Sequence, residues 1–327
     1  MTGRLHREVE SMYGGIRLIG GTSTPDLAQE ISDYLYTPLS GRDVIEFPNE
    51  NIFVRLHSSA RGQDVYVIQT TSSPVNYNLM ELLIVLQTLR LDSAARITAV
   101  VPYLCYSRSD KKDQPRVPIT ARLVADMIEV AGADRYITID LHAGQIQGFF
   151  SIPGDVLTAF HLLSDYFVAK RPEMVDPVIV TADLGFAKKG RNFAAKLSAP
   201  MAFIEKRRTG NDASAEAMTV IGDVNGKDVI IVDDEVDTAG SVSQAVNIVR
   251  DHGARNVYLS FVHPVLSGPA IERLKKLELT EIATTNTIPV PPHKKLPNLT
   301  ILSVAPLLGE VIRRAHEGRS VGEMFNE

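Results

Sequence analysis

Short apolar segments alternate with helical patterns along almost the whole chain, and this alternation constrains the fold more than any other feature. The apolar segments have the length of buried strands. Strands that alternate with helices imply parallel sheets that are covered by helices on both faces. The predicted strands are IRLIGG, VIEF, DVYVIQ, RITAVVPY and RYITIDL in the first half, and VIVTAD, MAFIEK, MTVIG, DVIIVDD, NVYLSFVH, TEIATT and LTILSVA in the second.

Two prolines mark expected helix starts. Pro25 follows Thr24, and Pro118 follows Val117. At a first helical turn the missing N–H of proline leaves no hydrogen bond unmade, so both sites favour a helix beginning there.

A faint internal repeat suggests two related domains. DVYVIQT from Asp64 and ARITAV from Ala95 resemble DVIIVDD from Asp228 and ARNVYL from Ala254. Any two strand–helix–strand units share some of this similarity, so the repeat alone leaves a chance resemblance open. We expect one α/β domain on each side of a boundary between residues 155 and 165, each a doubly wound parallel sheet.

The composition excludes several classes of protein. The net charge of −5 gives no electrostatic reason to expect nucleic acid as a partner. One cysteine, Cys105, excludes an intramolecular disulfide framework and fits a reducing cytosol. No apolar run approaches the roughly 20 residues that span a bilayer, and the N-terminal segment lacks the apolar centre of a secretory signal. We therefore expect a cytoplasmic protein without a membrane partner.

The segment VIIVDDEVDTAGSV, residues 229–242, ends a buried strand in two acids and continues in a turn of small polar residues. Adjacent carboxylates such as Asp233 and Asp234 can accept hydrogen bonds from sugar hydroxyls or hold a divalent cation. The turn from Thr238 to Ser241 opens a helix, and unpaired N–H groups at a helix N-terminus bind phosphate. The segment predicts a receptor for a sugar phosphate. An ordinary helix cap preceded by exposed acids is the alternative.

This segment resembles the phosphoribosyl-binding loop of type I phosphoribosyltransferases and of ribose-phosphate pyrophosphokinases. The resemblance implies that Asp233 and Asp234 contact ribose hydroxyls and that the turn holds the 5-phosphate, through Asp237, Thr238, Ala239, Gly240 and Ser241. It also implies that both domains have the fold of a type I phosphoribosyltransferase.

DLHAGQIQGFF, residues 140–150, distinguishes between the two groups of proteins. A lone histidine after a strand is more often structural, but the whole run is similar to the pyrophosphokinase motif around a histidine on the metal and nucleotide-phosphate side, here His142. Neutral imidazole can ligate a cation or contact a phosphate. The resemblance implies that His142 acts in catalysis, in ATP binding and as a metal ligand.

Further segments resemble the pyrophosphokinase family in order along the chain. YSRSDKKDQPRVPIT, which by composition alone is a solvated loop, is similar to the nucleotide loop, and FPNEN is similar to the segment that frames adenine across a dimer interface. IEKRRTG is similar to the catalytic flexible loop, and TADLGFAKKG to the pyrophosphate turn. The implied ATP-binding residues are Phe47, Asn49, Asn51, Arg108, Ser109 and Asp113, the implied catalytic pair is Lys206 and Arg208, and the implied second metal ligand is Asp183.

The resemblance extends to the C-terminal segment SVAPLLGEVIRRAHEGRSVGEMF. It implies a first domain over residues 1–160, on which a helix within 308–327 packs, and a second domain over 161–307. Homodimers that assemble into hexamers are implied as well.

Some positions depart from the family pattern. Asn51 stands where an acid is usual, Ser109 where glutamine is usual, and Phe186 where a second glycine follows Gly185. A side chain at 186 would be disfavoured if the backbone there needed a positive φ. Glu235 replaces an apolar residue and adds negative charge beside the phosphate loop.

The expected activity is transfer of the diphosphoryl group of ATP, with Mg²⁺, to the C1 hydroxyl of ribose 5-phosphate. Basic residues in a flexible loop suit this chemistry, because charge builds on the oxygens around the attacked phosphorus. One alternative is a catalytically silent paralogue that regulates an active partner. A less favoured alternative is a phosphoribosyltransferase.

Overall fold

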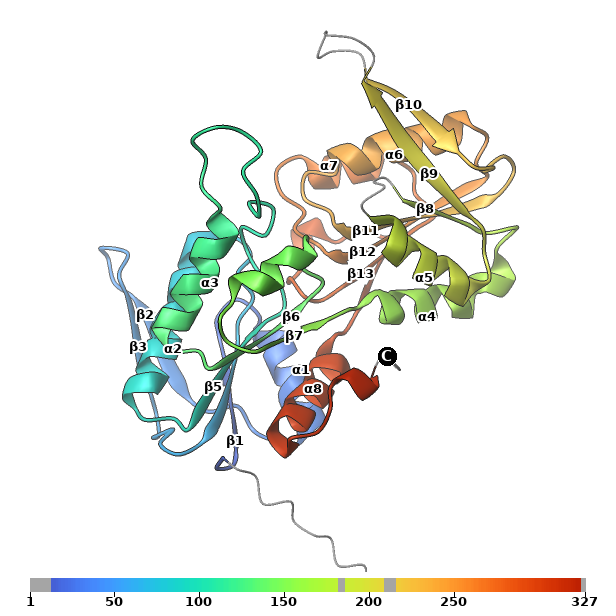
Figure 1. Cartoon of the computed structure of the whole chain (residues 1–327). Helices are drawn as coiled ribbons and strands as arrows, with labels where there is room; N and C mark the ends of the chain where they lie inside the picture. Colours follow the sequence, from blue (N-terminus) through green and yellow to red (C-terminus); the bar gives the residue numbers. More distant parts are fainter. Residues whose placement is uncertain (1–12, 182–185, 209–215, 325–327) are drawn as a thin grey trace, which may run out of the picture. The chain divides into compact units, whose positions relative to one another are not determined.

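The computed structural model describes residues 13–181, 186–208 and 216–324. The chain divides into two compact units, one formed by residues 1–157 together with 304–327 and the other by residues 158–303. Each unit is a twisted sheet between layers of helices (Figure 1). In the described part of the chain, no helix has both the length and the hydrophobicity that crossing a bilayer requires.

The first unit is built on a five-stranded parallel sheet of order β1-β4-β5-β6-β7. Helices α2 and α3 pack on one face of this sheet, and α1 and α8 pack against each other in the same unit. The strands are β1 (Ile16–Gly20), β4 (Asp64–Ile68), β5 (Arg96–Val101), β6 (Arg135–Ile139) and β7 (Gly154–Leu157), and the helices are α1 (Pro25–Leu35), α2 (Val75–Leu91), α3 (Thr120–Ala131) and α8 (Ala305–Glu317).

The second unit is built on a seven-stranded sheet of order β10-β9-β8-β11-β12-β13-β14. All neighbouring strands are parallel except the edge pair β9 and β10. The strands are β8 (Val178–Thr181), β9 (Met201–Arg208), β10 (Glu216–Ile221), β11 (Asp228–Glu235), β12 (Asn256–His263), β13 (Glu281–Thr285) and β14 (Leu299–Leu302), and the helices are α4 (Phe160–Lys170), α5 (Ala187–Leu197), α6 (Gly240–Asp251) and α7 (Ala270–Lys276).

Burial on both faces explains why the strands read as continuous apolar runs. In β4, Val65 and Val67 join the core beneath α2 and α3, while Tyr66 and Ile68 are buried on the opposite face. Side chains alternate along a strand, so a strand that is covered on both sides needs an apolar residue at every position. Each such side chain stabilises the fold by about 1.5–3 kcal/mol.

The two units share a topology. β8, β11, β12, β13 and β14 follow the same order as β1, β4, β5, β6 and β7. At the start of the central strands, Arg96 pairs with Asp64 in the first unit and Arg255 pairs with Asp228 in the second. The internal repeat that the sequence suggested is therefore matched by strand order and by an equivalent ion pair.

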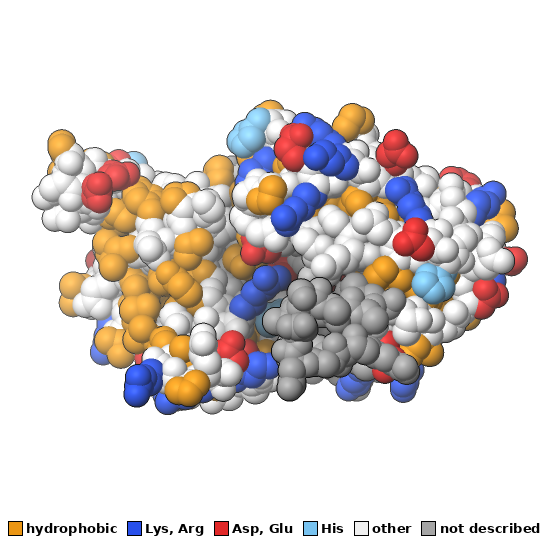
Figure 2. Space-filling view, turned by 90° about the horizontal axis from the view of Figure 1, so that it is seen from above, with side chains coloured by type: hydrophobic (Ala, Val, Ile, Leu, Met, Phe, Trp, Pro, Cys, Tyr) orange, Lys and Arg blue, Asp and Glu red, His pale blue; other side chains and the backbone are white. Residues whose placement is uncertain are grey.

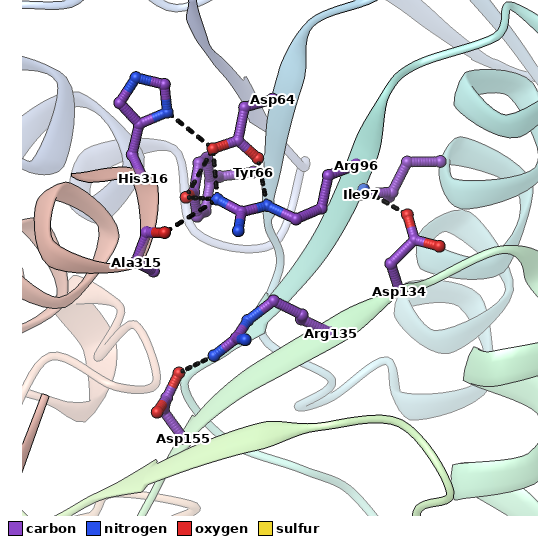
Figure 3. Close-up of polar contacts among 9 residues, drawn as sticks. All are labelled: Asp64, Tyr66, Arg96, Ile97, Asp134, Arg135, Asp155, Ala315 and His316. Atoms are coloured by element: carbon purple, nitrogen blue, oxygen red, sulfur yellow. Dashed lines mark hydrogen bonds and ion pairs between the residues drawn. The ribbon is translucent and has the colours of Figure 1, made fainter. Parts of the chain in front are cut away.

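The last turn of α8 completes the ion pair of the first unit (Figure 3). His316 Nδ1 lies 2.8 Å from Asp64 Oδ2, and Arg96 also donates to the carbonyl of Ala315 at 3.0 Å. The hydroxyl of Tyr66 donates to Asp64 at 3.0 Å. A carboxylate without solvent exposure is thus surrounded by three side chains, and the C-terminal helix is fixed to the sheet through two of its residues.

Three sequence expectations about the elements are wrong. VIEF does not form a buried strand: β2 (Arg42–Glu46) pairs with β3 (Ile52–Leu56) in a separate antiparallel hairpin, where Ile45 is 45% exposed. β10, which covers MTVIG, is antiparallel to its neighbour. The helix after Pro118 begins at Thr120, so this proline precedes the helix, whereas α1 begins at Pro25 as expected.

Candidate functional site

Three consecutive acids end β11 at the carboxyl edge of the second sheet. Asp233 is half-buried, and Asp234 and Glu235 are buried. Asp233 accepts the N–H of Asp234, and Asp234 accepts the N–H of Glu235, each at 2.9 Å. Burial, and next the negative charge of Asp234, raises the pKa of Asp233 well above its usual range. The carboxylates of these acids therefore repel one another, and a cation or the hydroxyls of a sugar beside them would reduce this repulsion.

The turn after these acids presents unpaired N–H groups. Residues 236–239 connect β11 to α6, which begins at Gly240, and Ala239 at the helix start has a left-handed backbone with φ of 58°. Among the described residues, the N–H groups of residues 238–241 have no hydrogen-bond acceptor. Consecutive unpaired N–H groups at such a turn form a concave site for an anion.

The segment that follows β12 donates hydrogen bonds to the carbonyl oxygens of this turn. The N–H of Leu266 donates to Val236 O at 2.9 Å, and the N–H of Ser267 donates to Asp237 O at 3.0 Å. Arg273 Nη1 donates to Thr238 O at 2.9 Å. Three successive carbonyls thus face this segment, and the N–H of each trans peptide points the opposite way. The N–H groups of Asp237, Thr238 and Ala239 therefore point away from this segment.

Sequence reasoning missed the residues of this segment. Ser267 donates a second hydrogen bond, from its hydroxyl to the carboxylate of Asp237, and Arg273 comes from α7, far along the chain. The sequence SGPAIER has no phosphate-binding signature of its own. Ser267 and Arg273 contact the turn only because the chain passes beside it again in the folded structure.

The neighbouring strands bring the other predicted residues toward this edge. Thr181 at the end of β8 is in register with Val232 of β11 and with Phe203 of β9. Asp183 follows two residues later and lies outside the described residues. β9 continues for five residues past Phe203, a further rise of about 16 Å, and its backbone includes Lys206 and Arg208. The side chains of these two residues also lie outside the described part.

Phe186 has an ordinary backbone conformation. Its φ is −90°, so the positive φ that would make a side chain unfavourable there is absent. Its ring packs on Phe160, with 5.1 Å between ring centroids. Gly185 lies outside the described residues. Phe186 is therefore accommodated within the second unit as a packing residue.

In the first unit, the predicted nucleotide residues follow two adjacent strands. Arg108, Ser109 and Asp113 come after β5, and His142 comes after β6, which pairs in parallel with β5. Arg108, Asp113 and His142 are exposed, and Ser109 is half-buried. Gln145 donates to Asp110, which joins the two segments. The four residues therefore belong to two segments that leave the same edge of the sheet and contact each other through Gln145 and Asp110.

Two buried residues frame that edge. Asp140, just before Leu141 and His142, has a left-handed φ of 41°, a conformation that side chains adopt rarely and that clusters at functional sites. Burial raises the pKa of Cys105 to about 11, so its thiol stays protonated and is not a nucleophile at neutral pH.

Phe47, Asn49 and Asn51 lie apart from the sheet that carries Arg108 and His142. They form the exposed turn of the β2–β3 hairpin, where Asn49 Oδ1 accepts the N–H of Asn51 at 3.2 Å. The ring of Phe47 is 45% exposed and lies 6.2 Å from that of Phe53. An exposed aromatic pair at a hairpin end is available to a ligand or to another subunit.

In the first unit, the position equivalent to the acid pair is occupied by Gln69, whose side chain is hydrogen bonded within the protein. Gln69 follows β4 as Asp233 continues β11, and its side chain accepts from Ser23 and donates to Glu81. Glu81 is buried and also accepts the N–H of Thr22 at 2.8 Å. Gln69 and Glu81 thus satisfy one another and their neighbours, so among the described residues of the first unit this position has no counterpart of the acid pair.

Comparison with known proteins was made on the whole chain. Residues 16–132 match the model of the N-terminal domain of ribose phosphate pyrophosphokinase, and residues 211–326 match the phosphoribosyl synthetase-associated domain. The chain is 49% identical to a ribose-phosphate pyrophosphokinase of Caldanaerobacter subterraneus subsp. tengcongensis, over 95% of this chain and 98% of that protein. It is 46% identical to one of Clostridium acetobutylicum, with the same coverage.

A solved structure agrees with these sequence relatives. The crystal structure of phosphoribosylpyrophosphate synthetase from Mycobacterium smegmatis is 41% identical to the chain and superimposes with a TM-score of 0.88. The similarity covers 93% of this chain and 99% of the other. It therefore spans both units.

Proposed function

Since the chain belongs to the ribose-phosphate pyrophosphokinase family, we propose that it transfers the diphosphoryl group of ATP to ribose 5-phosphate, giving phosphoribosyl pyrophosphate and AMP. The C1 hydroxyl oxygen of the sugar forms a bond to the β-phosphorus. The bond from that phosphorus to the oxygen shared with the α-phosphate breaks, and AMP leaves. The chain is an enzyme, a diphosphotransferase.

The single observation that carries this proposal is the unpaired turn directly after the acid pair. Asp233 and Asp234 accept hydrogen bonds from ribose hydroxyls, and the N–H groups of 238–241 hold the 5-phosphate. Asp237, fixed by Ser267, sets the start of the turn. One sugar phosphate can place hydroxyls beside the acids and its phosphate at the unpaired N–H groups, which neither a free sugar nor free phosphate does.

ATP is assigned to the residues that follow β5 and β6. In this proposal Arg108, Ser109, Asp113 and His142 contact the triphosphate side. Phe47 stacks on adenine while Asn49 and Asn51 hydrogen bond to it. Because these three residues lie on a separate hairpin, we assign them to the nucleotide of a neighbouring subunit.

Mg²⁺ is the proposed cofactor, with His142 and Asp183 as its protein ligands. Mg²⁺ in kinases takes most of its ligands from substrate phosphates and water, so a dedicated protein cage is not needed. When bound, Mg²⁺ neutralises triphosphate charge that otherwise repels the attacking oxygen.

Lys206 and Arg208 are the proposed catalytic residues. Both lie on the part of β9 that continues past the end of β8, beyond the carboxyl edge of the sheet. Positive charge that is aimed at the transferred group stabilises the transition state of phosphoryl transfer. Their role is electrostatic, so no covalent intermediate with the protein is required.

We further propose a homo-oligomer, dimers that assemble into hexamers, in the cytoplasm. Hydrophobic side chains gather on one face of the first unit (Figure 2). There α2 and α3 line an apolar groove of about 500 Å³, and Leu91 and Val130 at its rim are each 74% exposed. An apolar surface of this kind supports self-association.

The test is ³¹P NMR of the purified chain with ATP, Mg²⁺, ribose 5-phosphate and phosphate buffer. Equal amounts of AMP and a sugar-linked diphosphate are expected. Lys206→Ala should remove most of the rate and keep sugar-phosphate binding, and Lys196→Ala, an exposed lysine near the end of α5, should leave both unchanged. No turnover by a folded chain that binds ribose 5-phosphate would favour a silent regulatory paralogue instead. Attachment of a base from phosphoribosyl pyrophosphate would favour a phosphoribosyltransferase.

A further inference from the structure

Arg273 stands out among the groups that hold the phosphate-binding turn. Leu266 and Ser267 hold the carbonyls of Val236 and Asp237 through backbone N–H groups, which any residue would provide. The third carbonyl, that of Thr238, is held by the Arg273 side chain at 2.9 Å. Of the three contacts to carbonyls, this is the one that depends on the identity of a side chain, so a substitution at 273 can remove it.

The carbonyl that Arg273 holds is the one whose orientation matters most. It belongs to the peptide between Thr238 and Ala239, and Ala239 has the left-handed φ of 58°. A non-glycine residue keeps such a conformation only where its surroundings determine it. A rotation of this peptide would turn its oxygen toward the bound phosphate and its N–H away.

The position of the guanidinium is confined on its other side. A Cβ on Gly240 would lie 3.3 Å from Arg273 Nη1, closer than most contacts of this kind. The absence of a side chain at 240 therefore leaves room for the arginine beside the turn. Gly240 on α6 and Arg273 on α7 are therefore in close steric contact.

Arg273 also brings positive charge to an acidic neighbourhood. Asp233, Asp234 and Glu235 precede the turn, and a phosphate dianion beside them is repelled. In the described part of the chain, the Arg273 guanidinium makes its one hydrogen bond to Thr238 and no ion pair. Its neighbour Glu272 is engaged by Lys275 at 2.9 Å. Most of the five N–H donors of Arg273 thus stay available.

We propose that Arg273 is a positioning residue for the 5-phosphate of the sugar substrate. It fixes the Thr238 carbonyl so that the N–H of Ala239, in the same peptide, faces the phosphate, and it offsets the charge of the acid pair. This inference rests on the proposed function, because it assigns a role within the same sugar-phosphate site. It predicts that Arg273 governs the affinity for ribose 5-phosphate and has little influence on ATP.

The experiment compares Arg273→Ala with Arg250→Ala in steady-state kinetics. Arg250, on α6, also donates to a carbonyl, that of Glu278 at 2.9 Å, so it is a matched control near the opposite end of that helix. Arg273→Ala should raise the KM for ribose 5-phosphate about tenfold, the effect of losing a charge-assisted hydrogen bond. The kcat and the KM for ATP should change less than about twofold, and Arg250→Ala should change nothing.

Two further variants separate positioning from general stability. Arg273→Lys keeps the charge and should restore part of the affinity, and Gly240→Ala, which displaces the guanidinium, should raise the same KM while the protein stays folded. Calorimetry with ribose 5-phosphate and with ribose should show that Arg273→Ala weakens only the phosphorylated ligand.

Two outcomes overturn the proposal: an unchanged KM for ribose 5-phosphate in Arg273→Ala, or an equal rise in the KM for ATP. If Arg273→Ala does not fold, the Arg273→Lys and Gly240→Ala measurements decide in the same way. Absence of turnover by the unmodified chain would instead refute the proposed function, and calorimetry would still test Arg273.

Discussion

Arg96 holds both carboxylate oxygens of Asp64 where β5 and β4 begin, and the hydroxyl of Tyr66 and the C-terminal helix complete the cluster (Figure 3). The pair lies at the edge of the sheet opposite to the predicted ligand residues. Its equivalent in the second unit, Arg255 and Asp228, has the same geometry. The repeated element is therefore a support of the fold, and it lies away from the edge at which the two units carry different polar residues.

Replacing Arg96 by methionine should strongly destabilise the protein. The carboxylate of Asp64 has no solvent exposure, and breaking a buried ion pair by removing one partner costs about 3–5 kcal/mol. Urea unfolding followed by circular dichroism measures the change. Arg122→Met, which breaks an exposed pair with Asp126 on α3, should cost less than about 0.5 kcal/mol. Equal effects would contradict the structural role of Arg96.

Asp233→Asn should stabilise the ligand-free protein while it weakens substrate binding. The pKa of Asp233 is raised by burial and then by Asp234, so the folded state binds this proton more tightly than the unfolded state. The stability that this group contributes is present below its ordinary pKa and is lost as pH rises through the raised pKa. The variant should therefore melt higher at about pH 8, and the gain should vanish toward about pH 4.

Thermal melts across this pH range measure the effect of Asp233→Asn, and the KM for ribose 5-phosphate should rise about tenfold. Asp223→Asn is the matched control, since Asp223 is exposed and pairs with Lys227 at 2.8 Å. This control should not raise the melting temperature. A variant at 233 that melts lower than the unmodified protein at about pH 8 would count against a strained acid pair.

Ser267→Ala should weaken ribose 5-phosphate binding about fivefold. The hydroxyl of Ser267 donates to the carboxylate of Asp237, and one such hydrogen bond contributes about 1 kcal/mol. The KM for ribose 5-phosphate is the measured quantity. Ser164→Ala is the control, because that buried serine donates only locally, to His161 O in α4. An unchanged KM would show that the backbone hydrogen bond to Asp237 O is sufficient to position this residue.

Gly309→Ala should destabilise the packing of α8 on α1. Alanine is normally favoured over glycine inside a helix by about 1 kcal/mol. Here, however, the added Cβ would lie 2.3 Å from Tyr34 Cδ1. Limited proteolysis and thermal melts should therefore show a loss of stability. In the double variant Gly309→Ala with Tyr34→Ala, part of that loss should disappear, which additive effects would not produce.

Charged residues in the apolar groove should dissociate the proposed oligomer. Leu91→Glu together with Val130→Glu would place two carboxylates at exposed apolar positions of α2 and α3. The mass in solution, measured by light scattering, should fall, while circular dichroism stays unchanged. Leu123→Glu, on the exposed part of α3 outside the groove residues, tests whether the effect is specific. A mass that does not change would place the interface elsewhere.

Much of the fold could be predicted because burial on both sheet faces leaves a clear pattern. Every apolar run that was expected to be a strand overlaps one, and NVYLSFVH coincides with β12. β3 and β7 were missed. The hairpin β2–β3 has the apolar residues that are typical of a buried strand, but its strands are partly exposed. A short sequence pattern does not reveal whether helices cover a strand.

The site was partly predictable for a similar reason. The acids and the small-residue turn of 233–241 follow one another in the chain, so local sequence carries their chemistry. Ser267 and Arg273 reach the turn only because β12 and α7 return beside it. Contacts between distant segments depend on the three-dimensional path, which short sequence patterns do not encode.

The C-terminal helix gives the chain an unusual order of assembly. The first unit needs α8, whose His316 and Ala315 contact the Asp64 cluster, and the whole second unit lies between β7 and α8 in the sequence. Domains generally fold as units while the ribosome extends the chain from its N-terminus. Residues 158–303 leave the ribosome before α8 does. The later domain can therefore finish folding first, and the domain that is begun first is completed last.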